Sequence, residues 1–420
     1  MPPCKLLTSI IAQQFTMSEL PLTTTLAPNT TAELAALVRE AYASKTPIYP
    51  LGGETSLHFG VPVKTPGTGI SLGKLNRIVD YPFRDLTITV AAGIPMSELT
   101  ATLARERQQL PVDVPQANQA TLGGVLATNW NGPRRFGYGP LRDYVIGISA
   151  VDGRGMEFHG GGRVVKNVAG YDFCKLLTGS FGALGIITQV TLKVRPVPES
   201  VRTVAVVLNH EAEANQWLER LAQASITPVA IELASGPAWC QMFSLPPQAY
   251  VGLLRLEGTA TEVEWMLREL EREQRALQLR ELALPSVDDV WLQFIEWSAT
   301  GNAPLVLRAN VRPSQVLPFM RTVREIDGKC DFLAQAGNGV VDVKFSTFPA
   351  DGLSRTLVGK LQPLAAAQGG HIVLLANPSG AEMTRQCVWG GSEGSLTLMQ
   401  ALKQKFDPAG ILNPGRFVVG

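Results

Sequence analysis

Three glycine-rich segments in the first half of the chain constrain its fold most strongly. They are Gly52-Gly53, Gly123-Gly124 and a longer run over Lys166–Ile187, which reads KNVAGYD and then GSFGALGII. Because glycine has no Cβ atom, such segments suit a backbone that lies flat against a large ligand. Taken alone, each segment could equally be an ordinary glycine-rich loop. One large ligand contacted three times is a simpler explanation than three unrelated loops.

The first two segments each suggest a way to bind an anion. In Leu51–Ser56 (LGGETS), a strand runs into two glycines, so the following N–H groups can form a nest, with Thr55 and Ser56 as hydroxyl donors. In Thr121–Asn129 (TLGGVLATN), the glycines let the start of a helix approach a phosphate. Neither segment matches a P-loop or GxGxxG. The alternatives are a tight turn and a tightly packed helix start.

Bulk properties limit the class of protein. At 420 residues with 45% hydrophobic and 17% charged residues, the chain should form two globular domains. The net charge of +1 gives no electrostatic reason to expect nucleic acid or an anionic membrane surface as a partner. No apolar run approaches the ~20 residues that cross a bilayer. The five scattered cysteines include no CxxC pair and fit a reducing cytoplasm.

Periodicity and turn residues divide the chain into four regions, 1–20, 21–198, 199–394 and 395–420. Residues 1–20 are an extension that could be disordered, and Met17 is an alternative start. In 21–198, short strands, helices and glycine turns alternate up to the boundary at Arg195–Pro198. Residues 199–394 show two β-α-β-β-α-β passes, which indicate an α+β domain around an antiparallel sheet. The tail 395–420 should dock, because Ile411, Leu412, Phe417 and Val418 need burial.

The order of these motifs resembles a known family. The segments PLGGETS, TLGGVLATN, GYGPLRDYV, NVAGYD and GSFGALGII, with the closing FDPAGILNPGR, are similar to the FAD-linked oxidases of the vanillyl-alcohol oxidase (PCMH) type. Val165–Asp172 and Gly132–Arg135 most resemble the E-type FAD-binding subunits of bacterial glycolate oxidases. The resemblance implies an α+β fold with a two-subdomain FAD-binding domain at 21–198. It also implies an α+β cap or substrate domain at 199–394 and a tail, 395–420, that packs on the FAD domain.

The resemblance also implies which residues bind FAD. They are Pro50, Leu51, Gly52, Gly53, Glu54, Thr55, Ser56, Pro115, Thr121, Leu122, Gly123, Gly124, Ala127, Thr128, Asn129, Gly139, Gly182, Gly185, Ile186 and Ile187. Glu54 stands where relatives usually have glycine, so its carboxylate either turns outward or weakens binding of the pyrophosphate. Relatives that tether FAD through this loop have a histidine where this chain has Thr55, so we expect FAD to be non-covalent.

Candidates for catalysis are few. The chain has four histidines, none paired at metal-ligand spacing, and no metal site is expected. His371, at the start of an apolar strand, could face a flavin, and Arg135 could bind a carboxylate in bidentate fashion. Arg142 beside Asp143 is more typical of a surface ion pair.

These features predict an FAD subunit of a glycolate oxidase complex, which oxidises glycolate, a 2-hydroxy acid, and passes electrons to a respiratory acceptor. The resemblance implies a second FAD subunit and an iron-sulfur subunit as partners. It also implies a cytoplasmic location, with a place at the inner face of the membrane through the complex. Two alternatives stay open: a stand-alone FAD-dependent 2-hydroxy-acid dehydrogenase that uses Arg135 and His371, and a non-catalytic structural subunit that retains the fold.

Overall fold

A computed structural model describes residues 20–162, 170–277, 279–284, 286–391 and 393–419 of the chain. Residues 1–19 of the predicted extension 1–20 and the KNVA stretch of the longest glycine-rich run lie outside these residues. The described residues form two compact units. The N-terminal unit comprises Ser18–Asn131, Pro140–Val197 and Gly391–Gly420, and the central unit comprises Gly132–Gly139 and Pro198–Gly390. Residues 132–139, predicted to belong with 21–198, therefore cluster with the central unit instead.

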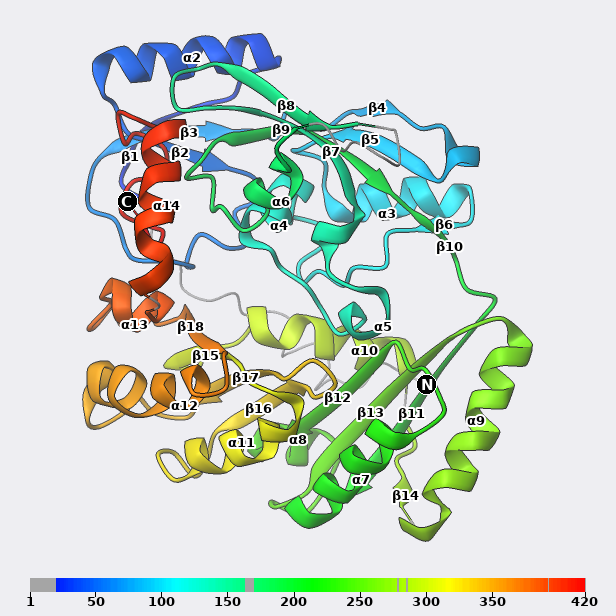
Figure 1. Ribbon diagram of the computed structural model, residues 1–420. Helices are drawn as coiled ribbons and strands as arrows, with labels where there is room; N and C mark the ends of the chain where they lie inside the picture. Colours follow the sequence, from blue (N-terminus) through cyan, green and yellow to red (C-terminus); the bar gives the residue numbers. More distant parts are fainter. Residues whose placement is uncertain (1–19, 163–169, 278, 285, 392, 420) are drawn as a thin grey trace. The chain divides into compact units, whose positions relative to one another are not determined.

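The N-terminal unit contains two main sheets, one parallel and one antiparallel (Figure 1). The parallel sheet has the order β1-β3-β2 and the larger sheet the order β4-β5-β9-β7-β8, with all pairs antiparallel. A short pair joins β10 to β6. The strands are β1 (Leu22–Leu26), β2 (Ile48–Leu51), β3 (Gly67–Ser71), β4 (Ile78–Asp80), β5 (Thr87–Ala91), β6 (Gln108–Gln109), β7 (Val145–Val151), β8 (Glu157–Gly161), β9 (Ile186–Lys193) and β10 (Arg195–Pro196).

Capping side chains explain where several helices of this unit begin. Helix α2 begins at Thr31, and the Thr30 hydroxyl accepts a hydrogen bond from the Glu33 amide at 3.1 Å. The Glu33 carboxylate accepts from the Asn29 amide at 2.8 Å, so it satisfies a second backbone donor before the helix. The helices are α2 (Thr31–Ser44), η1 (Phe83–Asp85), α3 (Met96–Arg105), α4 (Leu122–Thr128), η2 (Leu141–Tyr144), α6 (Phe173–Leu177) and α14 (Glu393–Phe406).

The tail after α14 returns to the N-terminal unit, as the sequence predicts. Ile411 and Leu412 are buried with residues of α2 and β2 in one apolar cluster. The Ile48 amide donates to the Ile411 carbonyl at 2.7 Å, and the Asn413 amide donates to the Ile48 carbonyl at 2.8 Å. The tail thus lies alongside β2, the strand that leads into the first glycine-rich segment.

The central unit is built on one sheet of eight strands, with every pair antiparallel (Figure 1). Its order is β14-β11-β13-β12-β16-β17-β15-β18. This confirms the predicted antiparallel sheet and the α+β class. The strands are β11 (Ser200–Leu208), β12 (Ala230–Ser235), β13 (Tyr250–Gly258), β14 (Arg280–Glu281), β15 (Leu305–Asn310), β16 (Asp331–Gln335), β17 (Val340–Phe345) and β18 (His371–Ala376).

Most helices of the central unit follow the predicted alternation, but α8 and α10 were not predicted. Helix α10 contributes Val290, Trp291 and Phe294 to an apolar cluster with the sheet. The helices are α5 (Arg135–Tyr138), α7 (Glu211–Gln223), α8 (Pro237–Met242), α9 (Ala260–Gln274), η3 (Arg275–Leu277), α10 (Val287–Glu296), η4 (Trp297–Ala299), η5 (Pro313–Gln315), α11 (Val316–Arg324), η6 (Ser354–Leu361), α12 (Gln362–Ala366) and α13 (Arg385–Trp389).

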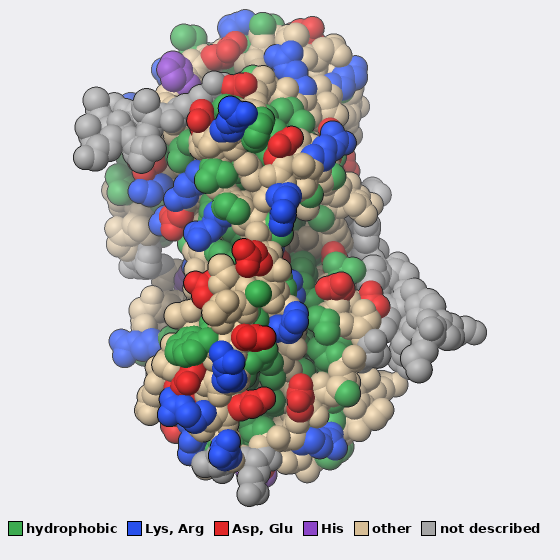
Figure 2. Space-filling view, turned by 90° about the vertical axis from the view of Figure 1, so that its right-hand side faces the viewer, with side chains coloured by type: hydrophobic (Ala, Val, Ile, Leu, Met, Phe, Trp, Pro, Cys, Tyr) green, Lys and Arg blue, Asp and Glu red, His purple; other side chains and the backbone are tan. Residues whose placement is uncertain are grey.

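Acidic and basic side chains are interspersed over the face shown in Figure 2, without a large area of one sign among the described residues in view. No helix within the described ranges is long and apolar enough to span a membrane.

Candidate functional site

The three glycine-rich segments meet in the N-terminal unit. The first and second touch at Gly52, where an added Cβ would lie 2.3 Å from the Thr121 hydroxyl oxygen, and Gly53 comes at least as close to the Gln119 carbonyl just before the second segment, with an added Cβ at 1.6 Å. The third reaches the first at Gly182, whose Cβ would lie 3.4 Å from Cγ of Pro50, and the second at Gly179, 3.4 Å from Cβ of Asn129. The fold therefore brings together segments that are distant in the sequence, and the first and third are more than a hundred positions apart.

The first segment presents backbone donors that the protein does not use. None of the five amides from Gly52 to Ser56 donates a hydrogen bond to another described residue. Glu54 has φ 60°, in the left-handed region, and its side chain is exposed. Of the two alternatives for Glu54, this conformation favours the outward one. Consecutive free amides at the end of a strand are the donors that an anion nest requires.

The second segment differs, because the start of α4 is already bonded within the protein. The Leu122 amide donates to the Ile94 carbonyl at 3.0 Å, and the Gly123 amide donates to the Ala92 carbonyl at 2.7 Å. The Gly124 amide donates to the Thr121 hydroxyl at 3.3 Å. A Cβ on Gly123 would lie 2.9 Å from Cβ of Ala92. The expectation of free N–H groups at this helix start is therefore wrong, and the glycine serves close packing.

The third segment is tied to the far end of α4. The Gly179 amide donates to the Leu126 carbonyl at 2.8 Å, and the Phe181 amide donates to the Ala127 carbonyl at 2.9 Å. Phe181 and Gly182 both have positive φ, 54° and 67°, so the chain turns sharply before β9. This turn places Gly182 beside Pro50 of the first segment.

The other residues predicted to bind FAD are placed as follows. Leu51, Pro115, Leu122, Gly185, Ile186 and Ile187 are buried in the N-terminal unit, whereas Thr55, Ser56, Ala127 and Thr128 are half-buried and Asn129 is exposed. Gly139 lies in the central unit.

Aromatic and basic side chains pack around the end of the first segment. Phe59 stacks on Trp130 with ring centroids 5.6 Å apart, and His58 meets Phe59 edge to face at 4.7 Å. Arg416 of the tail donates to the carbonyls of Leu57 and Phe59 at 2.7 and 2.8 Å. Burial lowers the pKa of His58 to about 4, and the Arg416 charge contributes to this lowering.

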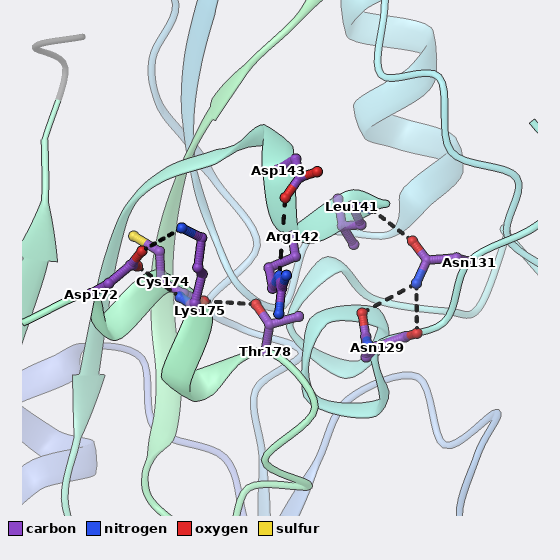
Figure 3. A network of polar contacts seen from close by, with 9 residues as sticks. All are labelled: Asn129, Asn131, Leu141, Arg142, Asp143, Asp172, Cys174, Lys175 and Thr178. Atoms are coloured by element: carbon purple, nitrogen blue, oxygen red, sulfur yellow. Dashed lines mark hydrogen bonds and ion pairs between the residues drawn. The ribbon is translucent and has the colours of Figure 1, made fainter. Parts of the chain in front are cut away.

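The polar groups around the end of α4 are shown in Figure 3. Asn131 donates to the carbonyl and the side-chain oxygen of Asn129 at 2.8 and 3.1 Å, and it accepts from the Leu141 amide at 2.7 Å. Arg142 lies 4.0 Å from Asp143 with both side chains about half exposed, as expected for a surface pair. The amide side chain of Asn131 thus fixes the turn that follows 132–139.

Both predicted catalytic residues belong to the central unit. Arg135 opens α5, whose Gly137 amide donates to the Val229 carbonyl at 3.0 Å, next to β12. His371 opens β18, where its Nε2 lies 3.3 Å from Nδ2 of Asn310. Strand β18 is four positions from β12 in the sheet, which corresponds to roughly 19 Å. This geometry does not place Arg135 and His371 around one small substrate, and a catalytic role for either stays a prediction.

A charged cluster on the central sheet was missed by sequence reasoning. Arg308 binds both carboxylate oxygens of Asp342 at 2.6 and 2.7 Å. Lys344 lies 4.3 Å over the Trp297 ring, and burial lowers its pKa to about 7 against the opposing effect of Asp331 and Asp342. The alternation in Val340–Phe345 (VVDVKF) places Asp342 and Lys344 on one face of β17, which is the signal that could have revealed them.

The described residues offer no site for a metal ion. Among them, no group of three or more His, Cys, Asp or Glu side chains could hold one.

The residues of the N-terminal unit fit a dinucleotide. The amides of Gly52–Ser56, which have no acceptor among the described residues, can donate hydrogen bonds to a pyrophosphate without the help of a basic side chain. The half-buried, small residues at Thr55, Ser56 and Ala127 leave the backbone accessible along the same junction. The donor set therefore agrees with the FAD that the motifs imply.

Comparisons with known proteins point the same way. Residues 23–161 match the FAD binding domain family, and residues 380–417 match the C-terminal domain of FAD linked oxidases. The chain is 28% identical over 392 residues to glycolate oxidase subunit GlcE of Escherichia coli (strain K12), covering 90% of this chain and 95% of that protein. It is 26% identical to glycolate oxidase subunit GlcD of Bacillus subtilis (strain 168), covering 93% and 88%.

The fold is also that of a solved enzyme structure. The structure of p-cresol methylhydroxylase with substrate bound superposes with a TM-score of 0.71 at 16% identity, covering 97% of this chain and 92% of the other. At that identity, the likeness concerns the fold alone. The chain therefore contains an FAD binding domain and the C-terminal domain of FAD linked oxidases, its fold is of the PCMH type, and it is an oxidoreductase with FAD as its cofactor.

Proposed function

We propose that this chain is the FAD-binding subunit of a glycolate oxidase complex, in which glycolate is oxidised to glyoxylate and electrons pass to a respiratory acceptor. The observation that carries the proposal is the similarity to GlcE, which extends over 95% of that protein and thus includes the central unit. The similarity to GlcD, also a glycolate oxidase subunit, supports the same 2-hydroxy acid chemistry.

We place the FAD pyrophosphate at the amides of Gly52–Ser56, which have no acceptor in the described protein. When bound, FAD supplies a two-electron acceptor for the hydride that leaves the α-carbon of the hydroxy acid. The hydroxyl proton must leave to a base, and His371 is the candidate on this chain. Arg135 is the candidate for the substrate carboxylate, because a guanidinium can bind a carboxylate through two parallel hydrogen bonds.

One observation favours a narrower role in which this subunit holds FAD while a sister subunit oxidises glycolate. The two candidates for substrate binding lie four strands apart on the central sheet. Partners in this reading are a second FAD subunit and an iron-sulfur subunit, with the complex at the inner face of the cytoplasmic membrane. The stand-alone dehydrogenase and the structural subunit without FAD are the competing functions.

The absorbance of bound flavin tests whether the chain holds FAD. Bleaching of that flavin by glycolate tests which subunit oxidises the substrate. Purified chain should show oxidised flavin, released by denaturation because it is not covalently bound. Glycolate should bleach the flavin only after the partner subunits are added, if the narrower role holds. Bleaching of the isolated chain would support a stand-alone dehydrogenase. A colourless folded chain that does not take up added FAD would contradict the proposal.

A further inference from the structure

The C-terminal tail makes specific contacts with two of the three glycine-rich segments. Arg416 donates from one nitrogen to the carbonyls of Leu57 and Phe59 at 2.7 and 2.8 Å, at the end of the first segment. Asn413 donates to the Phe181 carbonyl in the third segment. Phe417 stacks on Phe181 with ring centroids 5.4 Å apart and an interplanar angle of 14°. The tail therefore connects loops that approach each other from distant parts of the sequence.

A buried lysine fixes both the tail and the third segment. The Lys403 ammonium donates to the Ala183 carbonyl at 3.0 Å, to the Leu412 carbonyl at 2.7 Å and to the Asp407 carboxylate at 2.7 Å. These three bonds use all the donors of an ammonium group. Asp407 in turn accepts from the Ile411 and Leu412 amides at 3.1 and 2.7 Å. The charges are thus compensated inside the N-terminal unit, where both residues are buried.

Such contacts restrain the loops before a ligand binds. Without them, the loops would lose conformational freedom on binding. The amides of Gly52–Ser56 have no acceptor among the described residues, so backbone hydrogen bonds donated by this stretch do not hold it between its two ends. Strand β2 fixes one end, and Arg416 fixes the other through Leu57 and Phe59. A loop already held in its bound conformation binds its ligand more tightly, because less conformational freedom is lost.

We propose that residues 403–417, the end of α14 and the tail that follows it, form a positioning element that holds segments 51–59 and 179–185 in the FAD-binding arrangement, with Arg416, Lys403 and Asn413 as positioning residues. The inference rests on the placement of FAD proposed above. It assigns to the tail an effect on cofactor affinity that is separate from its contribution to folding.

Affinity for FAD and stability of the apoprotein should therefore change independently. We would remove FAD, measure its Kd by flavin fluorescence titration, and measure the Tm of the same apoprotein. Arg416→Met should raise the Kd by about 10- to 100-fold, since it removes two charge-assisted hydrogen bonds. Arg416→Lys should recover part of this affinity. Asn413→Gly keeps the left-handed backbone, φ 48°, but removes the bond to Phe181, and it should raise the Kd by about tenfold.

Ile411→Ala is the matched control, because the Ile411 side chain is buried in the same tail, in an apolar cluster that includes residues of α2 and β2, and forms none of the hydrogen bonds to the two segments. It should lower the Tm at least as much as Arg416→Met while changing the Kd by less than about threefold. The inference would be overturned if Ile411→Ala and Arg416→Met lost the same amount of Tm and also raised the Kd by the same factor. Unchanged Kd in both Arg416→Met and Asn413→Gly would also overturn it while leaving the FAD placement intact. A parent apoprotein that does not bind FAD would overturn both.

Discussion

The first and second glycine-rich segments share a Gly-Gly pair but differ in what their backbones do. In Gly52–Ser56 the amides have no acceptor among the described residues, whereas the amides of Leu122, Gly123 and Gly124 at the start of α4 are all bonded within the protein. Glycine at 53 and 123 is required in both cases by a close approach of protein backbone. A glycine pair therefore indicates that another group lies close to the backbone. Only the hydrogen bonds of that backbone show whether the group can be a ligand.

The largest expected effect comes from adding a methyl group to the first segment. Gly53→Ala would place Cβ 1.6 Å from the Gln119 carbonyl oxygen, so the two segments must separate. We expect the free energy of unfolding to fall by about 3 kcal/mol or more, measured by urea denaturation. Gly124→Ala is the matched control, because its Cβ would lie 3.3 Å from the Thr121 hydroxyl. Similar losses in the two variants would show that the junction is not as close as described.

The second prediction concerns pH and the support of the first segment. The pKa of His58 is about 4 when folded, below the 6.5 of an unperturbed histidine, so the unfolded chain binds the proton more tightly. Stability from the neutral imidazole is therefore present above pH 6.5 and is lost as the pH falls toward 4, a loss of roughly 3 kcal/mol. Urea denaturation between pH 7 and 4.5 should show a weaker pH dependence in His58→Phe than in the parent. Parallel curves would contradict this.

The third prediction concerns Glu54, which lies within the proposed anion nest. Glu54 adopts φ 60° with an exposed side chain, a conformation that costs a non-glycine residue about 1 kcal/mol. Glu54→Gly should raise the Tm of the apoprotein and lower the Kd for FAD, because even an outward-facing carboxylate on this loop repels the charge of the phosphates through the solvent. Glu54→Gln separates the two causes, since it removes the charge and keeps the strained backbone. An unchanged Kd in both variants would argue against a pyrophosphate at this loop.

The smallest effect is expected at the start of α4. Thr121→Ala removes the hydroxyl that accepts from Gly124, and it should lower the free energy of unfolding by about 1 kcal/mol. The Kd for FAD should change little, because the amides of this helix start are used by the protein. A large rise in Kd without further loss of stability would show that Thr121 contacts the cofactor, and the contrast between the two segments would then fail.

The sequence predicted the fold best where the pattern of apolar residues along the chain matches the strands and helices that form. The two β-α-β-β-α-β passes in 199–394 predicted the antiparallel central sheet, because short apolar runs such as those of β12 and β13 are typical of strands buried in a sheet. Helix α10 was missed, since Trp291 and the acidic residues of the first turn indicate a helix only once the sheet surface that Trp291 covers is known. The hydrogen bonds of Gly123 to Ala92 and the association of 132–139 with the central unit depend on tertiary contacts, which no local pattern encodes.

Hydrogen exchange of the backbone amides, with and without FAD, tests the contrast between the two segments most directly. In the apoprotein, the amides of Gly52–Ser56 should exchange fast and those of Leu122–Val125 slowly, since the latter are already bonded. Added FAD should slow exchange in a peptide covering Gly52–Ser56 strongly and leave the α4 peptide almost unchanged. Strong new protection at Leu122–Val125, with none at Gly52–Ser56, would contradict the account.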